Sequence, residues 1–511
     1  MENAIFKGDN NPNAIPVWGV FAIFAALVGP PMILFILFAH RTETRPSRHR
    51  TATLLVLGDI GRSPRMMYHA ASLAQAGWDT YVIGYGDTAP IPALLETPLV
   101  HLLHLHNPPK PLLALPWILR APIRILYQVI SVIYLAIFKV PCNTQILLVQ
   151  NPPSIPTLLL AQLISGTTRS KLIIDWHNTG YSILAMRLGE KSPIVRIAKW
   201  FERYFGQDAY CHLFVTRALE EFLVKEWHLR GRTAVLHDRP PSQFRRTEMI
   251  NRLELFKRIT PEVRPPLPDF INTKDIKKTA FTELTPSGNV ELRADRPAFL
   301  VSSTSWTADE DFSLLLKALD IYQKAKSAGN KNLPVVLMVI TGKGALRKPF
   351  EAEVAKREKS GAWPDVVVRC QFVSAKDYPI LLGSTDLGVS MHQSSSGRDL
   401  PMKVVDMFGC GVPVLARGFP CIDELVKDGR NGRVFNTAEE LGEQLIDTLE
   451  YFPKSDKLTH LQSFFQATAN PSSGSRRLSR SSPDASEPEW STWDQNWDLV
   501  MKHNVLDFKK R

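Results

Sequence analysis

The sequence lacks the signatures of several common protein classes. Its five cysteines are scattered and form no Cys-x-x-Cys pair, which argues against a disulfide framework or a zinc site and favours a reducing compartment. No zinc-finger spacing or aromatic RNA-binding motif accompanies the formal net charge of +11, so we expect no nucleic acid partner. A basic chain of this kind suits anionic lipid surfaces or phosphorylated substrates instead.

Two further absences exclude enzyme classes and metal sites. The first glycine loop reads Gly58-Asp-Ile-Gly-Arg-Ser63 and lacks the full Gly-x-Gly-x-x-Gly spacing, which disfavours a Rossmann dehydrogenase. No carboxylate or cysteine accompanies the three closely spaced histidines His101, His104 and His106. We therefore interpret them as part of a strand and its exit, and not as metal ligands.

One long hydrophobic run stands near the N-terminus. Residues 15–39 are almost wholly apolar and uncharged, and about 20 such residues span a bilayer. A basic run over residues 40–50 follows directly, so the positive-inside rule predicts a lumenal N-terminus and a cytosolic remainder. A cleaved signal peptide is the competing interpretation, but positive charge that follows a long apolar run fits it poorly. We therefore expect an uncleaved single-pass transmembrane anchor.

A second apolar stretch covers residues 112–140. Arg120 and Arg124 interrupt it, and the uninterrupted part, 125–138, is short for a membrane span. One interpretation is a membrane-associating segment that lies in the interface with its basic residues facing headgroups. A buried core helix fits the pattern equally well.

Strands alternate with helical patterns in two regions, residues 51–238 and 296–452. This alternation predicts two doubly wound Rossmann-like domains with parallel sheets, and ligands at the carboxyl ends of the strands. The expected strands are 53–57, 81–84, 100–105, 146–150 and 171–175 in the first region, and 299–303, 335–341, 366–370, 387–389 and 412–416 in the second.

Three other regions differ in composition. Residues 239–295 are rich in proline and basic residues and are expected to form a connecting region with a mobile loop. Residues 455–489 lack apolar periodicity and are expected to be disordered. Residues 490–508 return to aromatic and apolar spacing, which predicts a terminal helix that packs back on a domain.

The segment 396–416 carries the strongest functional pattern. It reads as a loop, a helix and a buried strand, and the carboxylates of Asp399 and Asp406 stand on either side of Lys403. A helix N-terminus offers free backbone N–H groups and a partial positive charge, which suits a diphosphate. The segment therefore has the pattern of a donor-nucleotide site, although an ordinary αβ unit with charged surface residues is the alternative.

Five strings of residues together resemble one family. They are Gly58–Met66, Asp175–Tyr181, Leu236–Pro240, Ser302–Phe312 and Asp399–Ala416. Standing in this order between about residues 54 and 435, they resemble the chitobiosyldiphosphodolichol β-mannosyltransferases of N-glycan assembly. The resemblance implies the α/β GT-B fold, with an acceptor domain and a GDP-mannose-binding domain that face a cleft.

The resemblance also implies an activity and a location. The expected reaction moves mannose from GDP-mannose to GlcNAc2-diphosphodolichol and forms the first β-1,4-linked mannose of the N-glycan precursor, at the cytosolic face of the endoplasmic reticulum membrane. Membrane lipid is an expected partner, and other glycosyltransferases of the same pathway are candidate partners. The alternatives are a GT-B enzyme that uses another sugar nucleotide and a non-catalytic membrane scaffold subunit; intact Asp399 and Lys403 favour activity.

The chain departs from related patterns at Arg398, where the family usually shows a small or apolar residue. Retaining GT-B families often place two glutamates in this segment, and the corresponding positions here are Arg398 and Asp406. Their donor-site geometry therefore does not transfer literally to this chain.

An α-linked donor and a β-linked product imply one direct displacement, which needs a base for the acceptor hydroxyl. His177 follows a strand end beside Asp175, which could orient the imidazole, and Asp59 follows another strand end in a glycine loop. A hydrogen-bonded structural histidine is the alternative for His177. The candidate catalytic residues are therefore His177 and Asp59.

The remaining candidates bind substrate. For the donor diphosphate we expect Lys403 and the helix N-terminus near Leu400, with Lys343 in Gly342-Lys-Gly344 as a second cation or a solvated turn lysine. Asp399 and Asp406 are candidates for ribose or mannose hydroxyls. GT-B enzymes stabilise the leaving group with helix dipoles and basic residues, so we expect no metal and no cofactor.

The acceptor diphosphate is expected in the first glycine loop. Gly58 and Gly61 would permit its close approach, and Arg62 and Arg65 would be its cationic partners. Arg62 could equally lie at the membrane rim.

Overall fold

The computed structural model describes residues 47–109, 117–273, 275–307, 310–394, 396–469 and 490–507. The expected anchor over residues 15–39 lies outside this part of the chain. Within the described part, no helix combines the length and the hydropathy that crossing a bilayer requires.

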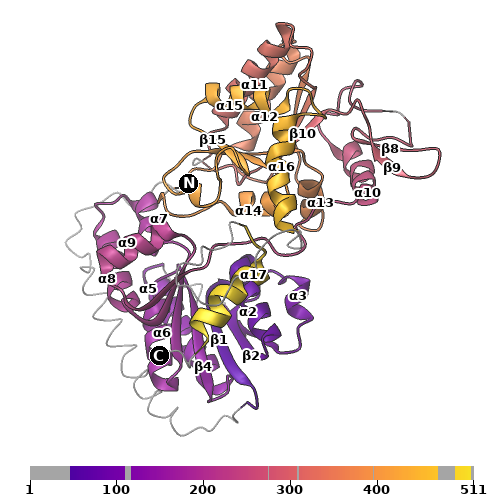
Figure 1. The fold of residues 1–511 in the computed structure, drawn as a ribbon. Coiled ribbons are helices and arrows are strands. Elements are labelled where there is room, and N and C mark those ends of the chain that lie inside the picture. The colour runs from indigo at the N-terminus through magenta and orange to yellow at the C-terminus, as the bar shows by residue number, and fades with distance from the viewer. Residues whose placement is uncertain are drawn as a thin grey trace. The chain divides into compact units, whose positions relative to one another are not determined.

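The chain divides into two compact units. The first comprises Met1–Leu213 and Lys225–Thr233, and the second comprises Phe214–Val224 and Ala234–Arg511. Each unit is built on its own sheet, and Figure 1 traces both.

The sheet of the first unit has seven strands in the order β3-β2-β1-β4-β5-β6-β7. The pairings from β3 through β2, β1 and β4 to β5 are all parallel. The central stretches of β1 and β4 are buried aliphatic runs, as expected for a parallel sheet covered by helices on its faces. The strands are β1 (Arg50–Asp59), β2 (Trp78–Tyr85), β3 (Val100–Leu105), β4 (Thr144–Asn151), β5 (Lys171–Trp176), β6 (Asp208–Phe214) and β7 (Arg230–Val235).

Helices alternate with these strands, as the sequence predicts. Helix α2 begins with a proline in its first turn, where a missing N–H costs no hydrogen bond, and most of its residues are buried, polar ones included. The helices are α2 (Pro64–Gln75), α3 (Pro92–Leu95), α5 (Trp117–Phe138), α6 (Thr157–Thr168), α7 (Gly180–Leu188), α8 (Pro193–Gly206) and α9 (Arg217–Trp227).

The second unit contains a six-stranded sheet in the order β12-β11-β10-β13-β14-β15, and every pairing in it is parallel. The strands are β10 (Ala298–Ser303), β11 (Val336–Thr341), β12 (Val366–Cys370), β13 (Leu387–Ser390), β14 (Val414–Arg417) and β15 (Gly432–Phe435). The helices between and after them are α11 (Phe312–Ser327), α12 (Arg347–Lys359), α13 (Tyr378–Gly383), α14 (Met402–Gly409), α15 (Ala438–Leu449) and α16 (Asp456–Ala469).

Both sheets reverse their strand order once, and the reversal fixes where ligands can bind. The order switches between β1 and β4 in the first unit and between β10 and β13 in the second. Open α/β sheets bind ligands outside the carboxyl ends of the strands at such switch points. The loops that follow Asp59, Asn151, Ser303 and Ser390 are therefore the places to search for a site.

The expected connecting region, residues 239–295, contains regular structure. It holds helix α10 (Met249–Ile259) and the antiparallel strands β8 (Thr282–Leu284) and β9 (Val290–Leu292). Phe256 and Phe281 are buried here, and their rings lie 5.4 and 4.6 Å from the ring of Phe299 in β10. Part of this region thus belongs to the core of the second unit.

One boundary needs correction. We expect disorder from residue 455, but residues 456–469 form α16. Leu458, Leu461 and Phe465 are buried at helical spacing, and this short apolar stripe is what the composition argument overlooks. Residues 470–489 lie outside the described chain.

The expected terminal helix begins as α17 (Trp493–Trp497) and continues as a π-helical stretch, Asp498–Val505. A capping box between Thr492 and Gln495 starts it. Just before the helix, the ring of Trp490 lies 5.4 Å from that of Phe408 in α14.

Candidate active site

In the second unit, the loop after β10 meets the start of α14. Nζ of Lys403 lies 2.7 Å from Oε1 of Glu310, and the other carboxylate oxygen of Glu310 accepts hydrogen bonds from Thr304 and from the backbone N–H of Ser305. Glu310 is buried, whereas Lys403 is partly exposed. The carboxylate therefore holds a lysine at the first turn of α14, where backbone N–H groups are also available for an anion.

Glycines allow the loop after β11 to pack against the loop after β10. Gly342 has a φ of +139°, and a Cβ there would overlap the carbonyl oxygen of Thr304. Lys343 lies between two such glycines, with Nζ 3.8 Å from the centroid of the half-exposed Phe372 ring. This second predicted cation is thus placed on an aromatic face at the carboxyl edge of the same sheet.

Serine hydroxyls hold the carboxylate of Asp399. Ser394 and Ser396 both donate to its Oδ1, the latter over 3.0 Å. Nε2 of His392 lies 3.9 Å from Oδ2. The loop after β13 thereby fixes one predicted hydroxyl-binding carboxylate.

Asp406 lies one turn beyond Lys403 on α14. Burial raises the pKa of Asp406 to about 8, and the nearby charge of Asp238 adds to the effect. A carboxyl group that keeps its proton near neutral pH can donate one hydrogen bond to a hydroxyl as well as accept others.

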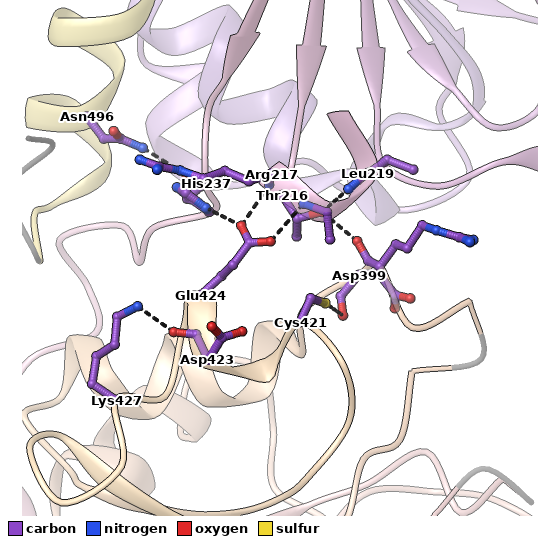
Figure 2. Close-up of polar contacts among 12 residues, drawn as sticks. Thr216, Arg217, Leu219, His237, Asp399, Cys421, Asp423, Glu424, Lys427 and Asn496 are labelled. Atoms are coloured by element: carbon purple, nitrogen blue, oxygen red, sulfur yellow. Dashed lines mark hydrogen bonds and ion pairs between the residues drawn. The ribbon is translucent and has the colours of Figure 1, made fainter. Parts of the chain in front are cut away.

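A carboxylate outside the predicted set ties three segments of the second unit together (Figure 2). Glu424 accepts hydrogen bonds from the backbone N–H groups of Arg217 and Ala218 at the start of α9, over 2.7 and 2.9 Å. Nε2 of His237 lies 2.8 Å from Oε2 of Glu424. Burial acts to raise the pKa of Glu424, but hydrogen bonds from His237 and from these two N–H groups hold it below the usual range.

The same segment reaches the Asp399 loop. Thr216, directly before α9, donates to the carbonyl oxygen of Arg398 over 2.6 Å. The Arg398 guanidinium lies 3.7 Å from the ring centroid of Phe222, and Cys421 donates weakly to the carbonyl oxygen of Asp399, as Figure 2 shows. His237 belongs to one of the five strings that carry the family resemblance, and this was the available signal for the cluster.

In the first unit, Asp59 ends β1 and caps the short turn that follows it. Its Oδ1 accepts hydrogen bonds from the backbone N–H groups of Gly61 and Thr88, over 3.3 and 3.1 Å. A hydrogen bond with the Thr88 side chain contributes most to lowering the pKa of Asp59, and the two backbone bonds add to it against the opposing effect of burial. Asp59 therefore stays ionised and is engaged with its own loop.

The other residues of the first glycine loop differ in their surroundings. A Cβ at Gly61 would overlap the carbonyl oxygen of Thr88, whereas a Cβ at Gly58 would meet nothing within 4 Å. The Arg62 side chain is 80% exposed and reaches Asp59 over 3.4 Å. Its guanidinium is accessible to an anion.

His177, the other base candidate, directly follows β5. Its Nε2 atom lies 2.8 Å from Oδ2 of Asp175, which is fully buried, while the His177 side chain is 24% exposed. Nε and Nη2 of Arg65 donate to the two oxygens of Asp175, over 2.8 and 2.9 Å. Burial acts to raise the pKa of Asp175, but Arg65 and His177 hold it well below the usual range.

The backbone around His177 is also held in place. Its N–H donates to the carbonyl oxygen of Asn151 at the end of β4, over 2.9 Å. Buried Glu202 on α8 accepts hydrogen bonds from the Asn151 amide and from the N–H groups of Gly180 and Tyr181 at the start of α7. The imidazole is thus the partly exposed end of a fixed polar network.

In the described residues no group of three or more histidine, cysteine or carboxylate side chains is arranged to hold a metal ion. His101, one of the three closely spaced histidines, is instead paired with Asp79 over 2.7 Å.

Comparison with known proteins identifies the family. A protein from mouse named chitobiosyldiphosphodolichol beta-mannosyltransferase is 38% identical over 482 residues, which cover 93% of this chain and 92% of the mouse protein. The chain belongs to the chitobiosyldiphosphodolichol beta-mannosyltransferase family. Residues 297–451, within the second unit, match the family model for glycosyl transferases group 1.

Two other matches bear on sugar nucleotide and fold. A relative from Arabidopsis thaliana, named UDP-glycosyltransferase TURAN, is 40% identical over 79% of this chain and 89% of its own length. The crystal structure of Anabaena HepE in complex with UDP covers 82% of this chain and 94% of its own, with a TM-score of 0.53 at 15% identity. The latter likeness establishes the GT-B glycosyltransferase fold, and the two parallel sheets predicted for this family are confirmed.

Proposed function

We propose that this protein transfers mannose from GDP-mannose to GlcNAc2-diphosphodolichol and inverts the sugar configuration. The names of its relatives support the reaction, since the mouse protein is a chitobiosyldiphosphodolichol beta-mannosyltransferase. The structural observation that supports this mechanism is the His177–Asp175 pair, in which a partly exposed imidazole is paired with a buried, ionised carboxylate.

The chemistry is a single displacement. The acceptor hydroxyl oxygen forms a bond to C1 of mannose while the bond from C1 to the diphosphate oxygen breaks, and GDP leaves with the electron pair. His177 takes the proton of the attacking hydroxyl, and Asp175 stabilises the imidazolium that results. Because one displacement inverts the configuration, an α-linked donor gives a β-linked product.

The leaving diphosphate gains negative charge as this bond breaks. Lys403 and the N-terminal turn of α14 are the groups that would stabilise it, with Lys343 as a second cation. Glu310 keeps the Lys403 ammonium at this position. Asp399 and Asp406 would bind ribose or mannose hydroxyls, and Gly58, Gly61 and exposed Arg62 would bind the acceptor diphosphate.

We further propose that the protein works at the cytosolic face of the endoplasmic reticulum membrane, held by the apolar run 15–39. The surface of α8 supports a membrane-facing role for the first unit. Trp200 and Tyr204 are 59% and 62% exposed, and the exposed cations Lys199 and Arg203 lie on the same helical face. Amphipathic rings beside basic side chains suit an anionic lipid interface.

Helix α5 supports the same role for the segment 112–140. Ile130 and Tyr134 lie one turn apart and are exposed, while Val132 and Ile133 are buried. The helix therefore combines a core-packed face with an apolar exposed face, which joins the two interpretations that the sequence left open.

The decisive experiment is mannose transfer by the purified protein. GDP-mannose and a short-lipid diphosphate-chitobiose acceptor are supplied with EDTA present, and the linkage of the product is assigned. A single β-1,4-linked mannose is the expected result. Absence of product from folded protein would refute the proposal.

The name of the Arabidopsis relative favours testing a second donor. The same assay with UDP-sugars should give no product if GDP-mannose is the donor. Transfer from a UDP-sugar alone would establish the alternative of a different sugar nucleotide.

A further inference from the structure

Arg65 belongs to the loop expected to contact the acceptor diphosphate, but its guanidinium is directed into the first unit. The residue is 4% exposed. Its Nε and Nη2 atoms form a bidentate pair with Asp175, 110 positions further along the chain. Arg62, three residues earlier, has the opposite environment and is mostly exposed.

We propose that Arg65 is a positioning residue that acts on His177 through Asp175. By balancing the carboxylate charge, Arg65 lets His177 meet the acceptor hydroxyl as a neutral imidazole able to take a proton. This inference rests on the proposed function of His177 as the base, and it assigns Arg65 no contact with substrate.

Three side chains surround one carboxylate oxygen of Asp175. Oδ2 of Asp175 lies 2.8 Å from Nε of Arg65, 2.8 Å from Nε2 of His177 and 3.4 Å from Nε2 of His69. Burial lowers the pKa of His69, so that imidazole adds no charge near neutral pH. Arg65 is the partner that keeps its charge at every working pH.

The electrostatic consequence follows from charge balance. A buried carboxylate beside a lone imidazole favours the protonated form of the ring, and a protonated ring cannot serve as a base. With Arg65 paired to Asp175, the carboxylate still accepts the hydrogen bond that orients His177, but it favours the imidazolium less strongly than a lone carboxylate would, because part of its charge is offset. Glu202, the other buried carboxylate near this loop, is hydrogen-bonded to the Asn151 amide and to backbone N–H groups of α7.

The first test is the pH dependence of kcat/KM in the Arg65→Met variant. Loss of the positive charge should favour protonated His177. The acidic limb of the profile should therefore move to higher pH by about 1 pH unit or more. The KM for the acceptor should change little at the new optimum. Arg65→Lys keeps the charge and should leave the limb in place.

Arg62→Met is the matched control on the same loop. As a surface cation available to the acceptor diphosphate, Arg62 should raise the acceptor KM when removed and leave the acidic limb unmoved. If Arg65→Met behaves in this way instead, Arg65 contacts the substrate and the proposal is overturned.

A double-mutant comparison isolates the route through Asp175. In an Asp175→Asn background, adding Arg65→Met should shift the acidic limb less than it does in the native background, because only the direct effect of the Arg65 charge on His177 is then lost. Equal shifts in the two backgrounds would overturn the proposal.

A readout independent of catalysis separates this inference from the proposed function. The His177 ring can be followed by NMR in protein labelled at histidine, with its signals assigned by their loss in His177→Gln. The titration midpoint should rise in Arg65→Met relative to the native protein, even if no mannose transfer is found. An unchanged midpoint would refute the charge-balancing role.

Discussion

Nζ of Lys403 lies 2.7 Å from Oε1 of Glu310, although 93 positions separate the two residues in the sequence. The pair joins the loop after β10 to the first turn of α14, next to the point where the strand order of the second sheet reverses. A lysine held in this way is available to a diphosphate without a search through its side-chain rotamers, which lowers the entropy cost of binding.

Lys403→Ala should therefore lower kcat/KM for GDP-mannose by about 100-fold or more, because a cation that stabilises the leaving group is lost. Steady-state kinetics at fixed acceptor concentration measure this effect. Lys317→Ala, an exposed lysine on α11, is the matched control and should be neutral. Near-normal turnover by folded Lys403→Ala would remove Lys403 from the site.

Glu424→Gln should destabilise the second unit by about 2 kcal/mol at pH 7, since the ionised carboxylate accepts hydrogen bonds from His237 and from two backbone N–H groups. The folded-state pKa of Glu424 lies below its ordinary value of 4.5. Its ionised form therefore favours folding above about pH 4.5, and this advantage is lost as the pH falls through the folded-state pKa.

Denaturant unfolding of the native protein and of Glu424→Gln at pH 7 and pH 4 measures the difference. The difference in the free energy of unfolding between the two proteins should be smaller at pH 4 than at pH 7. A difference that is constant over this range would show that the charge of Glu424 is not what stabilises the cluster.

Asp406→Asn should show the opposite pH trend. Burial raises the folded-state pKa of Asp406 to about 8 from an ordinary value of 3.8, so the folded protein retains a proton that the unfolded chain releases. The contribution of Asp406 to stability therefore falls as the pH rises between these values. Relative to the native protein, Asp406→Asn should become more stable as the pH rises from 5 to 8.

The same unfolding measurements at pH 5, 6.5 and 8 test this trend. If the difference in the free energy of unfolding between the native protein and Asp406→Asn does not depend on pH, Asp406 is already ionised at pH 5.

Removal of residues 1–40 should leave the chemistry intact on a soluble short-chain acceptor, because every candidate catalytic and substrate-binding residue lies beyond this segment. Turnover of a long-chain acceptor in vesicles should fall. Parallel assays of both acceptors measure the two effects, and a folded protein that is inactive on the soluble acceptor would contradict a purely anchoring role.

Local patterns were enough to predict much of the fold. The aliphatic runs of β1, β4 and β5 and the helix α14 are visible in the sequence because burial on both faces, or on one helical face, constrains neighbouring residues. Strands β6 and β7 were not predicted. Their sequences, Asp208–Phe214 and Arg230–Val235, mix charged and apolar residues without a long aliphatic run.

The site was only partly predictable for a different reason. The candidates His177, Asp59 and Lys403 could be named because each follows a strand or begins a helix. The partners of Lys403 and Asp175, namely Glu310 and Arg65, lie 93 and 110 positions away. Tertiary packing decides which distant side chains meet, and a single sequence taken without an alignment carries no signal for such pairings.

Helix α9 is shared between the two units: residues up to Val224 are grouped with the second and residues from Lys225 with the first. The chain therefore passes from one unit to the other three times, within residues 213–234. No single cut can separate it into two halves that each keep all of their own segments. Wherever a single break is placed, one of the two polypeptides carries a segment that is grouped with the other unit, so separately expressed halves should be less stable than the intact chain.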